Sequence, residues 1–367
     1  MRVLHLDTEM GWRGGENQLR LLLEGLRDYP VTSHLAARPG SAAERRLSDL
    51  ATVVAYPMRG GFDPVAAYRI ATYCKKNHID LIDAHTGNGH SLGLMIKTLI
   101  PSIKLVVHRR VDNVPKKSLI NRRKYLSPLV DRYVAISQAI ANILEDYGIP
   151  KERIAVVRSA VPDNGYSDLN RVDEKQQLAQ AFGIHPDVVF IGNASALSPQ
   201  KGYPTLLAAA KILKDQGKPF HVFIAGDGEL RSSLESERIA LGLEHDVSFL
   251  GFIQDVPKFL SAIDILAMPS VNEGLGTLLL DASLARCAIA ATKVGGIPEV
   301  VTHGLTGLLS SVDDAPGLAA HLAQLIQEPT LRHDLSANAR HFVAREFSWE
   351  AMVRGNYDVY SALLSPD

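Results

Sequence analysis

Two acidic residues, Glu273 and Asp281, are separated by seven positions in a segment that also contains two glycines. The apolar run Ile265–Met268 predicts a strand before them, and the apolar run after Thr277 predicts a helix. Backbone N–H groups over Gly274–Thr277 would open that helix and point at an anion such as phosphate. Glu273 would then accept hydrogen bonds from sugar hydroxyls, and Asp281, expected roughly two turns deeper on the same helix side, would take a ribose hydroxyl. Without a ligand, Glu273 would interact with the helix dipole and Asp281 would be a solvated helix residue.

A lysine stands in a second loop of this kind. Lys201 follows the predicted strand Val188–Gly192 and precedes a periodic helix over Thr205–Lys214. A lysine ammonium at the carboxyl end of a strand is a compact cation for a diphosphate. A solvent-facing loop lysine is the alternative interpretation.

The N-terminal segment carries a glycine-rich turn between a predicted strand, Val3–Leu6, and a predicted helix, Asn17–Leu26. Gly14 and Gly15 would let the backbone approach a ligand, and the helix behind them favours an anion. The spacing is not the Gly-x-Gly-x-x-Gly of dinucleotide-binding proteins, which argues against a nicotinamide dehydrogenase. A tight turn without any ligand explains the glycines equally well.

The elements that must position these residues alternate between short apolar runs and amphipathic runs, which predicts parallel sheets covered by helices. Residues 158–175 are rich in Asp, Asn, Pro and Gly, which suits a linker between two doubly wound units. Ligands of such sheets bind outside the carboxyl ends of the strands. Besides those already named, the predicted strands are Ser33–Ala37, Thr52–Ala55, Leu81–Ala84, Leu105–His108, Tyr133–Ile136, Phe220–Ala225, Val247–Leu250 and Ala288–Ala291.

Composition excludes several classes of protein. The 367 residues suit two domains, and 39 basic against 40 acidic residues give no reason to expect a nucleic-acid partner. Cys74 and Cys287 support neither a disulfide framework nor a zinc site, so no metal is expected. The sequence has no apolar run of 18 residues and its first residues do not suit a signal peptide, so we expect a cytoplasmic protein.

Taken jointly and in this order, these segments resemble the retaining glycosyltransferases of family four (glycosyl transferases group 1). That family carries a Glu, seven residues and a Glu, matched here by Glu273 and Asp281, and a Lys-Gly loop, matched by Lys201-Gly202. The other segments that match are Gly14-Gly15, His108, Gly226-Asp227-Gly228, Phe249-Leu250-Gly251-Phe252 and Gly295-Gly296-Ile297-Pro298-Glu299.

The resemblance implies the GT-B fold, in which two Rossmann-like domains face an interdomain cleft. It implies an acceptor-binding domain over residues 1–165, a nucleotide-sugar domain over 175–345, and a C-terminal helix within 346–367 that crosses back to the first domain. The implied reaction moves a hexosyl group from a nucleotide-diphosphate sugar to a hydroxyl acceptor. Configuration would be retained, and neither a metal nor a cofactor would be required.

The resemblance also implies roles for single residues. Glu273, Lys201 and His108 would be catalytic, with His108 beside the donor sugar and the acceptor. The residues implied to bind the donor are Gly14, Gly15, Lys201, Gly226, Gly228, Phe252, Ile253, Glu273, Gly274, Leu275, Gly276, Thr277 and Asp281.

Two positions depart from the family pattern. The family usually has an arginine five residues before the loop lysine, as a second cation for the diphosphate, and this chain has Ala196. Arg13 or Arg109 would have to substitute for it. The second glutamate of the family is shortened to Asp281, which keeps a carboxylate with less reach. These departures keep a non-catalytic nucleotide-sugar-binding scaffold as an alternative. A sugar-nucleotide epimerase, which uses a similar two-domain scaffold, is another.

A basic cluster with interleaved apolar residues lies in the first half of the chain. It fits an amphipathic surface helix that contacts anionic lipid on the inner face of a membrane, or a lipid-linked or lipopolysaccharide-type glycan. A solvated basic helix face fits it as well. The cluster contains Lys116, Lys117, Arg122, Arg123 and Lys124, with Leu119, Ile120 and Tyr125 between them.

Overall fold

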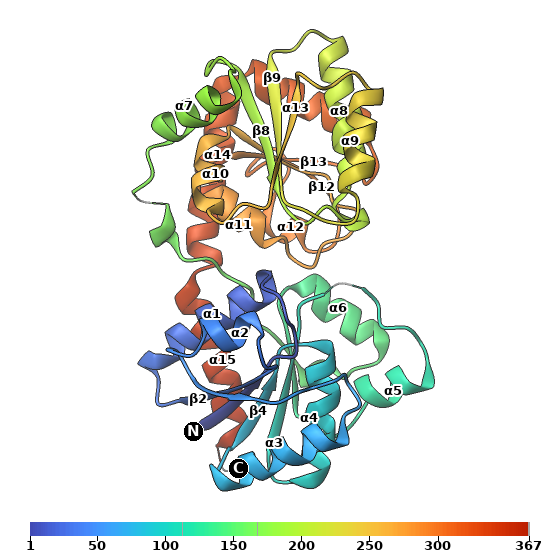
Figure 1. Cartoon of the computed structure of the whole chain (residues 1–367), viewed down its shortest axis with the longest axis vertical. Coiled ribbons are helices and arrows are strands. Elements are labelled where there is room, and N and C mark those ends of the chain that lie inside the picture. Colours follow the sequence, from blue (N-terminus) through green and yellow to red (C-terminus); the bar gives the residue numbers. More distant parts are fainter. Residues whose placement is uncertain (112, 167, 366–367) are drawn as a thin grey trace. The chain divides into compact units, whose positions relative to one another are not determined.

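The computed structural model describes residues 1–111, 113–166 and 168–365, and the chain divides into two compact units. The first unit consists of Met1–Ala160 and the C-terminal segment that begins at Trp349, and the second consists of Val161–Ser348. Each unit holds one parallel sheet flanked by helices (Figure 1). Parallel neighbours need a crossover connection, and here helices supply most of these crossovers and cover the sheet faces. The two doubly wound sheets predicted from the sequence are confirmed.

The sheet of the first unit has seven strands in the order β3-β2-β1-β4-β5-β6-β7. The six predicted strands are present with ends shifted by at most one residue, and β7 was not predicted. The strand order reverses at β1, which pairs with both β2 and β4. The strands are β1 (Arg2–Leu6), β2 (Thr32–Ala37), β3 (Thr52–Ala55), β4 (Leu81–Ala84), β5 (Lys104–Arg109), β6 (Arg132–Ala135) and β7 (Ile154–Val156).

Helices α1 and α15 cover one face of this sheet, where Leu22 and Tyr360 join a core with Val3 and Val106. Helix α1 begins three residues earlier than predicted because Glu16 accepts a hydrogen bond from the Arg13 backbone N–H. The helices of this unit are α1 (Gly14–Gly25), α2 (Ala42–Arg46), α3 (Pro64–Lys76), α4 (Gly87–Leu99), α5 (Leu119–Tyr125), α6 (Gln138–Tyr147) and α15 (Trp349–Leu364).

The sheet of the second unit has six strands in the order β10-β9-β8-β11-β12-β13, which reverses between β8 and β11. Strand β8 lies one to two residues later than predicted, and β13 was not predicted. The strands are β8 (Val189–Ala194), β9 (Phe220–Ala225), β10 (Val247–Gly251), β11 (Ile265–Met268), β12 (Ala288–Thr292) and β13 (Leu308–Ser310).

Eight helices are described around the second sheet. The first of them begins at Arg171, inside the stretch that the sequence indicated as a linker, so the end of that stretch is helical. No helix of the described ranges is both long enough and apolar enough to span a bilayer. The helices are α7 (Arg171–Phe182), α8 (Tyr203–Asp215), α9 (Arg231–Ala240), α10 (Val256–Ala262), α11 (Thr277–Leu284), α12 (Ile297–Val300), α13 (Ala315–Gln327) and α14 (Pro329–Glu346).

Candidate functional site

Lys201 and Glu273 meet at the point where the strand order of the second sheet reverses. Lys201 follows β8 and Glu273 follows β11. The Lys201 ammonium donates to Glu273 Oε2 over 2.6 Å, and the two side chains are 15% and 14% exposed. Crevices outside the carboxyl ends of strands at such a reversal are where open α/β sheets bind ligands. Two of the three predicted catalytic residues therefore lie together, at a position that suits a ligand.

Glycines let the loops around this ion pair pack against one another. The Val271 N–H donates to the Gln200 carbonyl over 2.9 Å, which ties the loop after β11 to the loop after β8. A Cβ atom on Gly295 would lie 1.9 Å from the Glu273 carbonyl oxygen, and the φ of Gly295 is +53°. No side chain fits there, so the glycine is required by this close approach and by its left-handed backbone.

Helix α11 presents its amino end beside Glu273. Gly274, Leu275 and Gly276 are buried, and Thr277 is partly buried as the first helical residue. The first amides of an α-helix have no intrahelical acceptor and carry the positive end of the helix dipole. The Leu275 side chain is 1% exposed, so this residue offers a ligand only its backbone.

Asp281 lies about one turn into α11, not two turns, because the helix begins at Thr277. The Tyr166 hydroxyl donates to Asp281 Oδ1 over 2.6 Å. Burial raises the pKa of Asp281 to about 6, and the hydrogen bond from Tyr166 opposes that rise. Sequence reasoning missed Tyr166, which is 115 positions away and carries no motif signal.

The remaining donor residues predicted in the second unit follow β9 and β10. A Cβ atom on Gly226 would lie 2.1 Å from the Ser195 carbonyl, and one on Gly228 would lie 2.5 Å from the Leu197 carbonyl. Close packing between loops therefore explains both glycines. Phe252 is 76% exposed at the end of β10, so its ring is available for stacking, and Ile253 is partly buried beside it.

In the first unit, Gly14 and Gly15 belong to the first turn of α1 rather than to the turn before it. A Cβ atom on Gly15 would lie 3.7 Å from Arg110 Cδ. Arg109 lies elsewhere, because its guanidinium donates to the Tyr125 hydroxyl over 2.8 Å and to Asn113 Oδ1 over 2.8 Å. Arg110, which sequence reasoning did not single out, is therefore the arginine beside Gly15.

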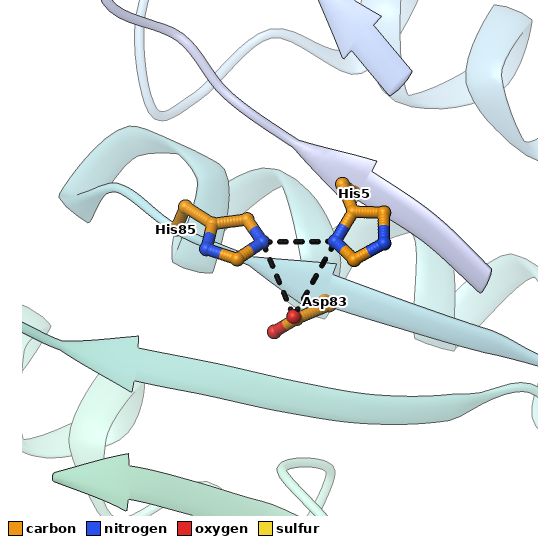
Figure 2. Close-up of side chains that lie close together, drawn as sticks. All are labelled: His5, Asp83 and His85. Atoms are coloured by element: carbon orange, nitrogen blue, oxygen red, sulfur yellow. Dashed lines mark hydrogen bonds and ion pairs between the residues drawn. The ribbon is translucent and has the colours of Figure 1, made fainter. Parts of the chain in front are cut away.

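His108 lies in a buried cluster of histidines around Asp83. Its Nε2 is 3.1 Å from Asp83 Oδ2, and its imidazole is 2% exposed. Figure 2 shows His5 on β1 and His85 after β4 turned toward the same carboxylate. Burial lowers the pKa of His108, and it lowers the pKa of His85 to about 3, although Asp83 opposes both shifts. Both imidazoles are therefore neutral at pH 7.

Two family patterns match the chain. Residues 173–342 match the pattern described as "Glycosyl transferases group 1", and residues 12–164 match "Glycosyltransferase Family 4". An uncharacterized glycosyltransferase of Methanocaldococcus jannaschii is 29% identical over 307 residues, which cover 82% of this chain and 80% of that protein. N-acetyl-alpha-D-glucosaminyl L-malate synthase of Bacillus anthracis is 25% identical over 313 residues, covering 83% and 81%.

Solved structures share this fold. The crystal structure of Anabaena HepE in complex with UDP-glucose aligns with a TM-score of 0.86 at 23% identity, over 99% of this chain and 100% of the other. The two Rossmann-like sheets are thus those of a GT-B fold. Together with the family patterns, which span most of both units, this shows that the chain belongs to glycosyltransferase family four.

Proposed function

We propose that this protein is a retaining glycosyltransferase that moves a hexosyl group from a nucleotide-diphosphate sugar to a hydroxyl acceptor without a metal ion. The observation that carries the proposal is the Lys201–Glu273 pair beside the amino end of α11. A cation beside the amino end of a helix suits a departing diphosphate, and a carboxylate there suits sugar hydroxyls.

Donor binding would change the partners of this ion pair. Lys201 would move from Glu273 Oε2 to a phosphate oxygen, and the amides of Gly274–Thr277 would donate to the same diphosphate. Glu273, released from Lys201, would accept hydrogen bonds from the donor sugar. The enzyme would thus stabilise the negative charge that develops on the leaving group, which is the usual electrostatic contribution to glycosyl transfer of this kind.

The other residues would hold the nucleotide. Asp281 has one oxygen bonded to Tyr166 and would offer the other to the ribose. Phe252 and Ile253 would meet the base. The close-packed Gly226 and Gly228 would keep the ligand-facing loops of the second unit tight, and Gly14 and Gly15 would open helix α1 toward the ligand. His108 would serve the acceptor side, where the incoming hydroxyl attacks from the face that the phosphate leaves.

The acceptor would be a lipid-linked or lipopolysaccharide-type glycan at an anionic membrane surface. Leu119 and Ile120 at the start of α5 are each 79% exposed, and Lys116, Lys117, Arg122 and Arg123 around them are exposed as well. Apolar side chains ringed by basic ones suit the interface of an anionic bilayer.

The decisive experiment has two steps. A thermal-shift screen with UDP, GDP, ADP, CMP, dTDP and their sugar conjugates identifies the donor; a ligand at ~100 times its dissociation constant should stabilise by about 2.7 kcal/mol. The product formed with an acceptor and that donor is then examined by NMR, with and without EDTA. Retained anomeric configuration that survives EDTA supports the proposal. Inversion refutes retention, turnover without an acceptor indicates an epimerase, and binding without any turnover indicates a scaffold.

A further inference from the structure

We propose that Arg110 binds an anionic oxygen of the substrate, a phosphate or a carboxylate, in the first unit, and that Asp83 positions Arg110 through His85 and His108. The inference rests on the glycosyltransferase function proposed above. It gives a substrate-binding role to a residue that had none in the sequence analysis.

Arg110 lies where a ligand of the first sheet is expected. It directly follows β5, and a Cβ atom on Gly15, in the first turn of α1, would be 3.7 Å from its Cδ. The strand order of this sheet reverses between β1 and β4, and ligands bind outside the carboxyl ends at such a reversal. Arg110 as a residue is partly exposed, and its Nε is buried without a hydrogen-bond partner among the described residues.

The charge of Arg110 has no carboxylate partner in direct contact. Its Nη2 donates to Nδ1 of His85 over 3.2 Å and to Nδ1 of His108 over 3.4 Å. Within the described ranges, no carboxylate oxygen forms an ion pair with this guanidinium within 4.0 Å. Burial lowers the pKa of Arg110, and the carboxylates of Asp83, Glu16 and Asp7, which do not contact it, oppose that shift. A guanidinium withdrawn from water and held by neutral acceptors favours an anionic ligand.

The hydrogen bonds of the cluster agree with one protonation pattern. A guanidinium can only donate, so Nδ1 of His85 and of His108 must accept. Their protons are therefore on Nε2, which lies 3.1 Å from Asp83 Oδ2 in each ring. The Tyr360 hydroxyl donates to the same carboxylate. Asp83 thus fixes both rings, and the two rings fix Arg110.

A metal site is the competing explanation. His5 Nδ1, His85 Nε2 and Asp83 Oδ2 lie 3.0, 3.1 and 3.5 Å apart (Figure 2). Ligand atoms around a tetrahedral zinc ion have similar separations of roughly 3.3 Å. Coordination, however, would need a lone pair on His85 Nε2 and would move the proton to Nδ1. That proton would then face the Arg110 N–H at 3.2 Å, so two donors would oppose each other.

The test measures the binding of two anionic probes to the variants Arg110→Met and Arg110→Lys, with Arg20→Met as the matched control. Arg20 lies on α1 of the same unit and pairs on the surface with Glu24. The probes are UDP alone, and inorganic phosphate added with and without saturating UDP, both followed by calorimetry at a temperature where every variant is folded. We expect Arg110→Met to weaken the binding of at least one of these probes by about tenfold or more, and Arg110→Lys to weaken that binding less. Arg20→Met should leave the affinity for both probes unchanged.

The two probes separate the source of the anion. Weaker UDP binding assigns Arg110 to the diphosphate of the donor, whereas weaker phosphate binding to the UDP complex assigns it to an acidic group of the acceptor. Phosphate binding that depends on Arg110 in a protein that binds no sugar nucleotide would keep this inference and remove the proposed function. Unchanged dissociation constants in Arg110→Met, or a wild type that binds neither probe, would overturn the inference.

The positioning role is tested with Asp83→Asn and with Tyr360→Phe, the milder change. We expect Asp83→Asn to weaken the binding of the same probe by about threefold or more. In the Arg110→Met background, Asp83→Asn should weaken that binding little further. If Asp83 contributes only to stability, the Asp83→Asn variant will have a lower melting temperature and wild-type dissociation constants. Metal analysis of the purified protein is expected to find well below one zinc per chain; a full equivalent that His5→Ala removes would overturn the protonation pattern.

Discussion

At the scale of single residues, Lys201 and Glu273 must be considered as a pair. Both side chains are largely shielded from water, and their atoms are 2.6 Å apart. Removing one partner leaves the other with an uncompensated charge, so each single change affects both the ligand-free protein and the donor complex. The contribution of each residue to catalysis therefore cannot be obtained from a single variant.

We predict that Lys201→Ala and Glu273→Gln each lower kcat/KM by at least about tenfold, or 1.4 kcal/mol of transition-state stabilisation. The double variant should lose much less than the product of the two effects, because both changes disable one arrangement. Steady-state kinetics with the identified donor measure kcat/KM of the wild type, the two single variants and the double variant. Wild-type kinetics in Lys201→Ala would remove this lysine from the site.

Asp7, which directly follows β1, is expected to make the stability of the protein depend on pH. It is 1% exposed, and burial raises its pKa to about 7. A carboxyl group with a raised pKa in the folded state binds its proton more tightly there than in the unfolded chain. The stability that this proton supplies is complete at low pH and is lost as pH rises toward 7.

We therefore predict that the wild type loses about 2 to 3 kcal/mol of unfolding free energy between pH 5 and pH 8 that Asp7→Asn does not lose. Urea unfolding of both proteins at the two pH values measures the difference. Parallel pH dependence in the two proteins would show that the Asp7 carboxyl titrates normally.

At the scale of elements, the loop after β12 is held against the loop after β11 through Gly295. Gly295→Ala brings a Cβ atom into the Glu273 carbonyl, whereas Gly304→Ala meets nothing within 4 Å, although the φ of Gly304 is +77°. The control thus carries the left-handed strain of roughly 1–2 kcal/mol without the collision. We predict that Gly295→Ala is clearly more destabilising in urea and also weakens donor binding. Equal effects of the two changes on both measurements would show that the loop yields without disturbing Glu273.

The amino end of α5 supplies a further prediction. Leu119→Ser with Ile120→Ser should abolish flotation with phosphatidylglycerol vesicles, because it removes the apolar contact and leaves the basic residues in place. Ile239→Ser is the matched control, since Ile239 is 58% exposed on α9 of the second unit. Binding should fall with salt and be absent with phosphatidylcholine. Flotation that survives the double change would argue against insertion of this helix.

Most helices and strands could be predicted from the hydrophobic pattern of the sequence, but contacts between residues distant in the sequence could not. Strands β7 and β13 are three residues long, too short for a periodic signal. Arg109 and Arg110 are neighbours in sequence, and only the course of β5 and the following residue decides that Arg110 is the one beside Gly15. Tyr166 meets Asp281 across 115 positions, a contact that no spacing rule reveals.

At the scale of the whole molecule, the two units differ in how the chain builds them. The second unit is one continuous stretch, Val161–Ser348, whereas the first needs α15 from the C-terminus. Trp349 donates its indole N–H to the Leu21 carbonyl over 2.8 Å, and Tyr360 donates to Asp83. Without α15, the apolar face of α1 and the buried Asp83 would lose these partners.

We therefore predict that a fragment of residues 161–348 folds alone and retains a cooperative thermal transition, while residues 1–160 do not. The fragment of residues 1–160 lacks the part of its core that α15 supplies. It would expose apolar surface, which costs about 25 cal/mol per Å². Adding a peptide of residues 349–365 should restore helical signal and cooperativity to residues 1–160, and the same peptide with Tyr360→Phe should restore less. Circular dichroism on heating measures each transition. If residues 1–160 melt cooperatively without the peptide, the contacts of α15 serve to place Asp83 and its histidines rather than to fold the unit. The binding test of Tyr360→Phe in the full chain would then report that role directly.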